Sequence, residues 1–145
     1  YLYAYAGQPW KTQARVRKLM RDMYHAERDG LPGNEDCGQM SAWFVLSALG
    51  LYPVDPVSGV YVFGSPLLDR AELALADGRR LLIEAHDNSP ENVYVQSVSW
   101  NGQPHPHNWI AHRELAAGGH LAFRMGAMPN LQFGASRSSR PPSFV

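Results

Sequence analysis

The spacing of apolar residues predicts helices in the first third of the chain. Between about residues 10 and 26, apolar side chains recur every three or four positions, at Val16, Leu19, Met20, Met23 and Tyr24. Most Lys and Arg residues of this segment fall between them, which is typical of an amphipathic helix with one solvated face. That basic face is more simply solvated than bound to an anionic partner. Residues 1–8 are expected to end another helix at Gly7.

A further helix is expected from about residue 37 to residue 49, and it is apolar almost all round. A helix without a polar face is normally buried on several sides. A chain of 145 residues offers little to surround such a helix. We therefore expect helices from outside this chain to pack around it. Gly50 ends the helix, and Pro53 and Pro56 keep it from resuming.

After about residue 58 the periodicity changes from helical to strand-like. Candidate strands cover residues 60–63, 72–75, 81–85, 93–100 and 121–125. Asp77-Gly78 and Asn101-Gly102 are two-residue hairpin signals. Residues 110–117 could form a short helix or a strand. This part of the chain is therefore expected to be antiparallel β-structure.

Helices followed by strands, with no βαβ pattern, indicate an α+β fold. We expect a helical segment over residues 1–57 and an antiparallel β-sheet or β-sandwich region over residues 58–134. A tail over residues 135–145 is rich in Ser, Arg and Pro, and it is expected to be mobile.

Composition narrows the class of protein. Hydrophobic residues make up 45% of the chain, enough for one domain with a core and too many for a disordered chain. The 13 Lys and Arg balance the 13 Asp and Glu, so charge gives no reason to expect nucleic acid or an anionic membrane as a partner. No apolar run approaches the roughly 20 residues that span a bilayer. Because the chain opens abruptly on Tyr-Leu-Tyr-Ala-Tyr-Ala, we expect a fragment of a longer protein, and the lack of a signal peptide then says nothing about localisation.

The glycine-rich loop over residues 28–38 holds the candidate chemistry. Its carboxylates, Asp29, Glu35 and Asp36, are of the kind that serve as general bases, nucleophiles or cation ligands. The structural alternative is that Asp36 merely caps the helix that follows. A cap needs one short polar residue, whereas this loop supplies Asn34, Glu35 and Asp36 between glycines. Gln39 is also polar in an otherwise apolar turn, as if it faced a polar ligand.

Other reactive residues give weaker signals. Cys37, the only cysteine, could be a nucleophile at a helix N-terminus. No partner histidine is apparent, so a small buried cysteine is the simpler interpretation. Four histidines could suggest zinc, but their spacing matches no helical His site, and surface-loop histidines are favoured. They are His105, His107, His112 and His120.

Tryptophans could stack on sugar rings. Trp43 lies in the apolar helix and is more simply a core residue. Trp100 and Trp109 remain open.

One long run resembles a known family: Gly33-Asn34-Glu35-Asp36-Cys37-Gly38-Gln39-Met40-Ser41-Ala42-Trp43. Shorter stretches resemble the same family in the right order, at residues 1–3, 6–7, 9–13, 51–53, 64–67, 101–102 and 118–130. On these residues the chain resembles the C-terminal part of glycoside hydrolase family 92, the calcium-dependent exo-α-mannosidases. The likeness covers residues 1 to about 130.

The resemblance implies the end of an (α/α)6 barrel followed by a β region. It also implies hydrolysis of α-linked mannose, α-1,2-linked above all, with inversion at the anomeric carbon. Asp36 matches the catalytic base. Some relatives carry a carboxylate where this chain has Asn34, whose amide can orient water but cannot take a proton. Glu35 is expected either to bind sugar hydroxyls or to help hold Asp36, and Gln39 is expected to bind the substrate.

The same resemblance places the general acid, and largely the calcium ligands, upstream of this chain. The expected partners are a mannose-containing glycan and the rest of the polypeptide, with no nucleic acid and no membrane. The expected location is periplasmic or secreted. Two alternatives stay open: a non-catalytic module that binds glycans through Trp100 or Trp109, and a purely structural domain.

Overall fold

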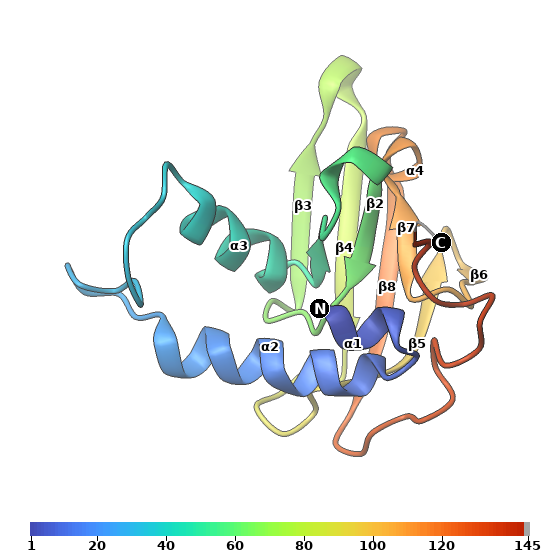
Figure 1. The fold of residues 1–145 in the computed structure, drawn as a ribbon. Helices are drawn as coiled ribbons and strands as arrows, with labels where there is room; N and C mark the ends of the chain where they lie inside the picture. The colour runs from blue at the N-terminus through green and yellow to red at the C-terminus, as the bar shows by residue number, and fades with distance from the viewer. Residues whose placement is uncertain (144–145) are drawn as a thin grey trace.

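The computed structural model describes residues 1–143, and its elements are arranged as in Figure 1. The helices are α1 (Leu2–Tyr5), α2 (Pro9–Met23), α3 (Gln39–Ala48) and α4 (His112–Ala116), with short 3-10 turns at Pro56–Ser58 and Ala76–Gly78. The strands are β1 (Leu51–Tyr52), β2 (Val60–Phe63), β3 (Arg70–Ala74), β4 (Arg80–His86), β5 (Tyr94–Trp100), β6 (Gln103–Pro104), β7 (Trp109–Ala111) and β8 (Gly119–Gly126). No helix in the described part of the chain is long and apolar enough to cross a membrane.

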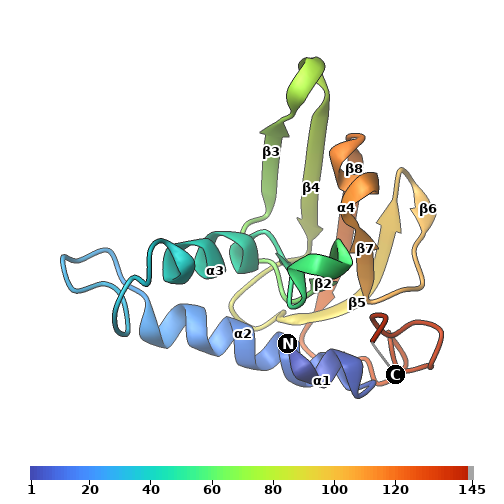
Figure 2. The same ribbon diagram turned by 45° about the horizontal axis from the view of Figure 1, so that its top comes forward.

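The helices α2 and α3 form an arm that projects from the β region, with the loop of residues 24–38 at its far end (Figures 1 and 2). We call these two helices and their loop the helical arm. Pro9 opens α2 at a position where its missing N–H costs nothing. The predicted apolar face is buried in part: Val16 and Met20 are buried, whereas Leu19 and Met23 are exposed. Gly7, at φ +75°, turns the chain between α1 and α2.

Two sheets make up the β region. One has the strand order β1-β2-β7 and the other the order β3-β4-β8-β5-β6. The predicted α+β fold is confirmed, with one feature that the pattern did not reveal: β4 and β8 pair in parallel. A parallel pair needs a long crossover, and here β5, β6, β7 and α4 lie between its two strands in the sequence.

Both predicted hairpins form. Asp77 and Gly78 have φ angles of +61° and +75°, and Asn101 and Gly102 have +49° and +79°. Two consecutive left-handed residues are what a type I′ turn requires, and such turns match the twist of paired strands. The ambiguous segment 110–117 contains both elements, because β7 ends at Ala111 and α4 follows at once.

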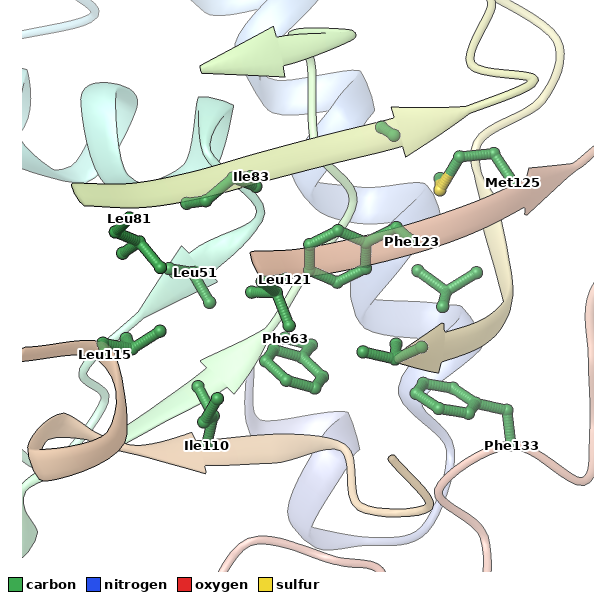
Figure 3. Close-up of a cluster of buried hydrophobic side chains, with 13 residues drawn as sticks. Leu51, Phe63, Leu81, Ile83, Ile110, Leu115, Leu121, Phe123, Met125 and Phe133 are labelled. Carbon is green, nitrogen blue, oxygen red and sulfur yellow. The ribbon is translucent and has the colours of Figure 1, made fainter. Parts of the chain in front are cut away.

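The main core lies between the two sheets, as Figure 3 shows. Phe63 of β2 and Phe123 of β8 meet edge to face at 5.3 Å, and both are fully buried. Ile110 of β7 and Leu121 of β8 are buried beside them. The strands alternate inward apolar and outward polar residues, so the hydrophobic effect holds the two layers together.

The C-terminal segment contributes to this core through Phe133. The backbone N–H of Asn108 also donates a hydrogen bond of 2.8 Å to the Ser139 carbonyl. The mobility of residues 135–145 stays a prediction, and residues 144–145 lie outside the described part of the chain.

The apolar helix α3 is little covered within the described chain. Only Ser47 and Ala48 of α3 are buried, and Val45 is 56% exposed. This agrees with the expectation from chain length, because too little of the described chain lies beside α3 to cover it; its cover by helices from outside the chain stays a prediction. One burial prediction is wrong. Cys37, expected to be buried, is exposed.

Candidate functional site

The four predicted site residues share the tip of the helical arm. Asn34, Glu35 and Asp36 lie in the loop, and Gln39 is the first residue of α3. Both ribbon views place this loop at the end of the arm that points away from the sheets (Figures 1 and 2). The structure thus groups these residues within one turn, away from the main core.

The backbone at the tip is unusual. Asp36, Cys37 and Gly38 follow one another with φ angles of +51°, +58° and +95°. Non-glycine residues rarely adopt this left-handed region, and each costs on the order of 1 kcal/mol or more. The turn reverses the chain into α3, with Gly38 as its N-cap residue. Asp36 is therefore held on a tight left-handed turn at the mouth of a helix.

The loop satisfies the first N–H groups of α3 without using the Asp36 side chain. A helix leaves four such groups unpaired at its start. Here the Gln39 amide donates to the Asp36 carbonyl at 3.3 Å and the Met40 amide to the Glu35 carbonyl at 3.2 Å. The Ser41 amide donates to Glu35 Oε1 at 3.2 Å, and the regular bonds of the helix begin with the Ala42 amide, which donates to the Gly38 carbonyl at 2.9 Å. The capping carboxylate is that of Glu35.

The neighbouring carboxylate of Asp36 is left available. Its side chain is exposed, and within residues 1–143 it has no hydrogen-bond or ion-pair partner. Asn34 is exposed as well. Gln39 Nε2 lies 3.5 Å from the Tyr52 hydroxyl, at the outer limit of a hydrogen bond. The geometry leaves Asp36 able to accept a proton or a hydrogen bond from a ligand.

The pockets of the arm lie beside this carboxylate and do not enclose it. One, of about 550 Å³, lies between the end of α2 and α3 and is lined by Tyr24, His25, Glu27, Ser41, Phe44 and neighbours. A second, of about 370 Å³, is lined by residues that include Met23, Gln39 and Trp43. Asp36 lines neither pocket. Tyr24 lines both pockets, and its ring is stacked 5.6 Å from that of Trp43. A closed substrate pocket around Asp36 would need further walls.

A metal site is not complete among the described residues. Within residues 1–143 no three His, Cys, Asp or Glu side chains come together as a cation would require. The described residues thus do not fit a resident calcium ion on their own. Two of the histidines considered as zinc ligands bond to backbone carbonyls instead. His105 Nε2 is 2.7 Å from the Trp109 carbonyl, and His107 Nδ1 is 3.1 Å from the Ser138 carbonyl.

The prediction that the histidines lie in surface loops is wrong for the other two. His112 begins α4, and His120 lies in β8, where its Nε2 is 2.8 Å from a Glu84 carboxylate oxygen. His120 and Glu84 pair across adjacent parallel strands. The tryptophans of the β region are half-buried, and Trp100 packs against the main core.

Ser41 is the residue of the tip that sequence reasoning missed. It donates through both its amide and its hydroxyl to the Glu35 carboxylate, the hydroxyl bond being 2.9 Å long. A capping box pairs residues three apart, whereas these two are six apart because a left-handed turn intervenes. No standard spacing would have indicated the pair.

Comparison with known proteins bears on the whole chain. Residues 1–127 match the family model described as the glycosyl hydrolase family 92 catalytic domain. An uncharacterized secreted glycosidase of Arthroderma benhamiae is 30% identical over 147 residues, covering 99% of this chain and 19% of that protein.

Solved structures agree. The family GH92 α-mannosidase BT3965 of Bacteroides thetaiotaomicron superposes with a TM-score of 0.94 at 36% identity, and it has also been solved in complex with mannoimidazole. The family GH92 inverting mannosidase BT2199 of the same organism has a TM-score of 0.92 at 42% identity. In both, the match covers 99% of this chain and 19% of the other. The chain therefore spans about a fifth of the length of these relatives.

Proposed function

We propose a function from one premise: this chain belongs to glycosyl hydrolase family 92. It is the C-terminal part of a longer polypeptide that acts as an inverting exo-α-mannosidase. The substrate is a glycan that ends in α-linked mannose, with α-1,2 linkages as the first candidate. One relative is named as an α-mannosidase and another as an inverting mannosidase, and they share the fold of this chain at 36% and 42% identity.

The observation that carries the proposal is the division of labour between two adjacent carboxylates. Glu35 completes the cap of α3, while Asp36 is exposed and unpaired within residues 1–143. Inverting hydrolysis needs one carboxylate to activate water and one carboxylic acid, roughly 6.5–9.5 Å away, to protonate the leaving oxygen. Asp36 is the water-activating base, and the acid comes from another part of the polypeptide.

The polar residues near Asp36 contact water, the sugar or the loop that carries Asp36. Asn34 orients water or a sugar hydroxyl through its amide. Both Glu35 oxygens accept bonds from Ser41, so Glu35 acts chiefly on the loop that carries Asp36, and the lone pair left on each oxygen allows only a lesser contact with a sugar hydroxyl. Gln39 can donate and accept on the side of α3 that faces the second pocket.

The rest of the polypeptide completes the site. The uncovered faces of α2 and α3, which expose Leu19, Met23 and Val45, pack against further helices. Calcium binds through oxygen ligands that lie largely outside this chain, and a hard cation suits the hydroxyls of mannose. The protein works outside the cytoplasm, as the name of its secreted fungal relative suggests.

The test is Asp36→Ala in the full-length protein, with release of mannose from α-1,2-mannobiose as the measurement. A general base contributes about 10²–10⁴-fold, so kcat should fall by that factor. Asp29→Ala, an exposed carboxylate of the same loop, is the matched control and should keep its activity. Near-normal release by the Asp36 variant would remove the base assignment. Proton NMR of the first-formed mannose anomer tests inversion, and α-1,3- and α-1,6-linked disaccharides test the linkage.

A binding module is the second candidate. Trp109 lines a pocket of about 440 Å³ with His112 and Arg113, and an aromatic face beside polar groups suits a sugar ring. Titration of methyl α-mannoside into the Asp36→Ala protein, followed by tryptophan fluorescence, separates the candidates. A signal that is lost in Trp109→Ala favours binding by the β region.

A further inference from the structure

We propose that Glu35 is a positioning residue for Asp36 and that it acts through Ser41. The inference rests on the proposed function, in which Asp36 activates water. It is carried by two contacts between the same pair of residues. Ser41 N–H donates to Glu35 Oε1 at 3.2 Å, and Ser41 Oγ donates to Glu35 Oε2 at 2.9 Å. Both carboxylate oxygens are therefore anchored to the first turn of α3.

This anchor spans the turn that displays Asp36. Three left-handed residues in a row, at positions 36–38, form a conformation that persists only when its surroundings hold it in place. Glu35 lies directly before that turn and grips α3 at two places. Its carbonyl accepts from the Met40 amide at 3.2 Å, and its carboxylate accepts from Ser41. The turn is thus clamped from the residue before it to the helix after it.

Nothing else among residues 1–143 holds the Asp36 side chain. Asp36 is exposed, and its only hydrogen bond among residues 1–143 is the one that its backbone carbonyl accepts from the backbone N–H of Gln39, 3.3 Å long. The direction of its carboxylate therefore follows from the backbone of the turn. A general base must lie about 2.6–3.2 Å from the proton it takes, and a misplacement of about 1 Å can cost about 10²-fold.

Positioning and substrate contact predict different kinetics. If Glu35 chiefly bound a sugar hydroxyl in the ground state, its loss would raise KM and Ser41 would be irrelevant. If Glu35 holds the turn, its loss lowers kcat with KM little changed, and the effect depends on Ser41. A glutamine at position 35 keeps the shape of the clamp, because its amide oxygen can accept from the Ser41 amide and its NH2 group can donate to the hydroxyl.

The experiment compares Glu35→Ala, Glu35→Gln, Ser41→Ala and the Glu35→Ala/Ser41→Ala double variant in the full-length protein, with α-1,2-mannobiose as substrate. We expect kcat to fall about 10- to 100-fold in Glu35→Ala, with KM within about twofold. Glu35→Gln should recover most of the activity. Ser41→Ala should fall between, because it keeps the backbone bond. The double variant should be no slower than Glu35→Ala, as expected for residues that act as one unit.

Matched variants separate the possible failures. Glu91→Ala, an exposed glutamate of the β region, should be neutral. A raised KM with normal kcat in Glu35→Ala, or an unaffected Ser41→Ala, or no recovery in Glu35→Gln, would overturn the positioning role. If Glu35→Ala fails to fold, the isosteric Glu35→Gln and Ser41→Ala variants still carry the test. Asp36→Ala reports on the proposed function alone: if it retains activity, the base assignment fails whatever the Glu35 variants do.

Discussion

The two ends of the helical arm use polar residues in opposite ways. At the root, Gln13 is fully buried and its Oε1 accepts from the Val95 amide at 3.1 Å. Arg17 donates to the Ser89 carbonyl at 2.6 Å, to Asn88 Oδ1 at 2.9 Å and to the Pro66 carbonyl. At the tip, by contrast, Asp36 is exposed and unpaired within residues 1–143. Polar groups at the root hold the arm, whereas the Asp36 carboxylate at the tip has no partner among residues 1–143.

The contrast shows how a carboxylate can be kept free at a helix start, where it would ordinarily cap. The loop at the tip provides other acceptors for the first N–H groups of α3, namely the backbone carbonyls of Asp36 and Glu35 and the Glu35 carboxylate. Once those donors are satisfied, no local bond competes for the Asp36 side chain. At the root the reverse holds, because the Arg17 guanidinium fits acceptors of two different loops in its fixed fork.

The largest stability effect should come from the root. Arg17→Ala leaves the acceptors of the 66–69 and 87–89 loops without their shared donor, and hydrogen bonds to charged groups contribute about 1.5–3 kcal/mol. We expect unfolding of the full-length protein in urea to require about 2–3 kcal/mol less. Arg15→Ala, an exposed residue of the same helix, is the control and should change stability by less than about 0.5 kcal/mol. An equal loss of stability in Arg17→Ala and Arg15→Ala would contradict the role of the Arg17 hydrogen bonds.

Glycines at the two ends of α3 sharpen the comparison. Gly38 at the tip and Gly50 at the root both have positive φ, +95° and +83°. A Cβ at Gly38 meets nothing within 4 Å, whereas a Cβ at Gly50 lies 3.1 Å from two Pro66 carbons. Gly38→Ala should cost about 1 kcal/mol from backbone strain alone. Gly50→Ala adds crowding of about 1 kcal/mol or more. Urea unfolding should therefore rank Gly50→Ala as the more damaging of the two.

A smaller change in stability is expected from the contact between Tyr1 and α3 at the root of the helical arm. The Tyr1 hydroxyl and Ser47 Oγ are 3.0 Å apart, and Ser47 is fully buried. Burial raises the pKa of the Tyr1 phenol well above its usual range, so the hydroxyl keeps its proton. Tyr1→Phe should cost about 1 kcal/mol, because it leaves Ser47 without this partner. Tyr3→Phe, at a side chain that is 40% exposed, is the control and should be close to neutral in the same measurement.

Local features of this fold could be predicted from the sequence, and long-range ones could not. The hairpins at Asp77-Gly78 and Asn101-Gly102 follow from residues that tolerate positive φ. The parallel pairing of β4 with β8 depends on how a whole sheet closes, and no window of sequence contains it. The bonds of Arg17 join residues about 70 positions apart, which is equally invisible in a local pattern.

The candidate site divides in the same way. Adjacent carboxylates at a helix start could be recognised, and so could their resemblance to a family. The sequence does not show which of the two carboxylates caps the helix, because this depends on the left-handed turn at residues 36–38. That turn brings Glu35 back onto Ser41 and points Asp36 elsewhere. The uncovered apolar residues of α3 could be anticipated, because periodicity reports what a helix needs to bury and the chain is too short to bury it; which segment covers them could not, because no local pattern contains it.

Asp22, on the last turn of α2, should give the smallest change in stability, and it tests the tip end of the helical arm. Hydrogen bonds from Arg21 and Lys18 lower the pKa of this exposed carboxyl to about 2. Because the folded pKa lies below the unfolded value of 3.8, the stabilisation is present above about pH 4 and is lost as the pH falls towards 2. The difference in urea stability between the protein and Asp22→Asn should be small at neutral pH, because exposed pairs are well screened, and should vanish near pH 2. A difference that grows on acidification would show that Asp22 is held by something other than these two cations.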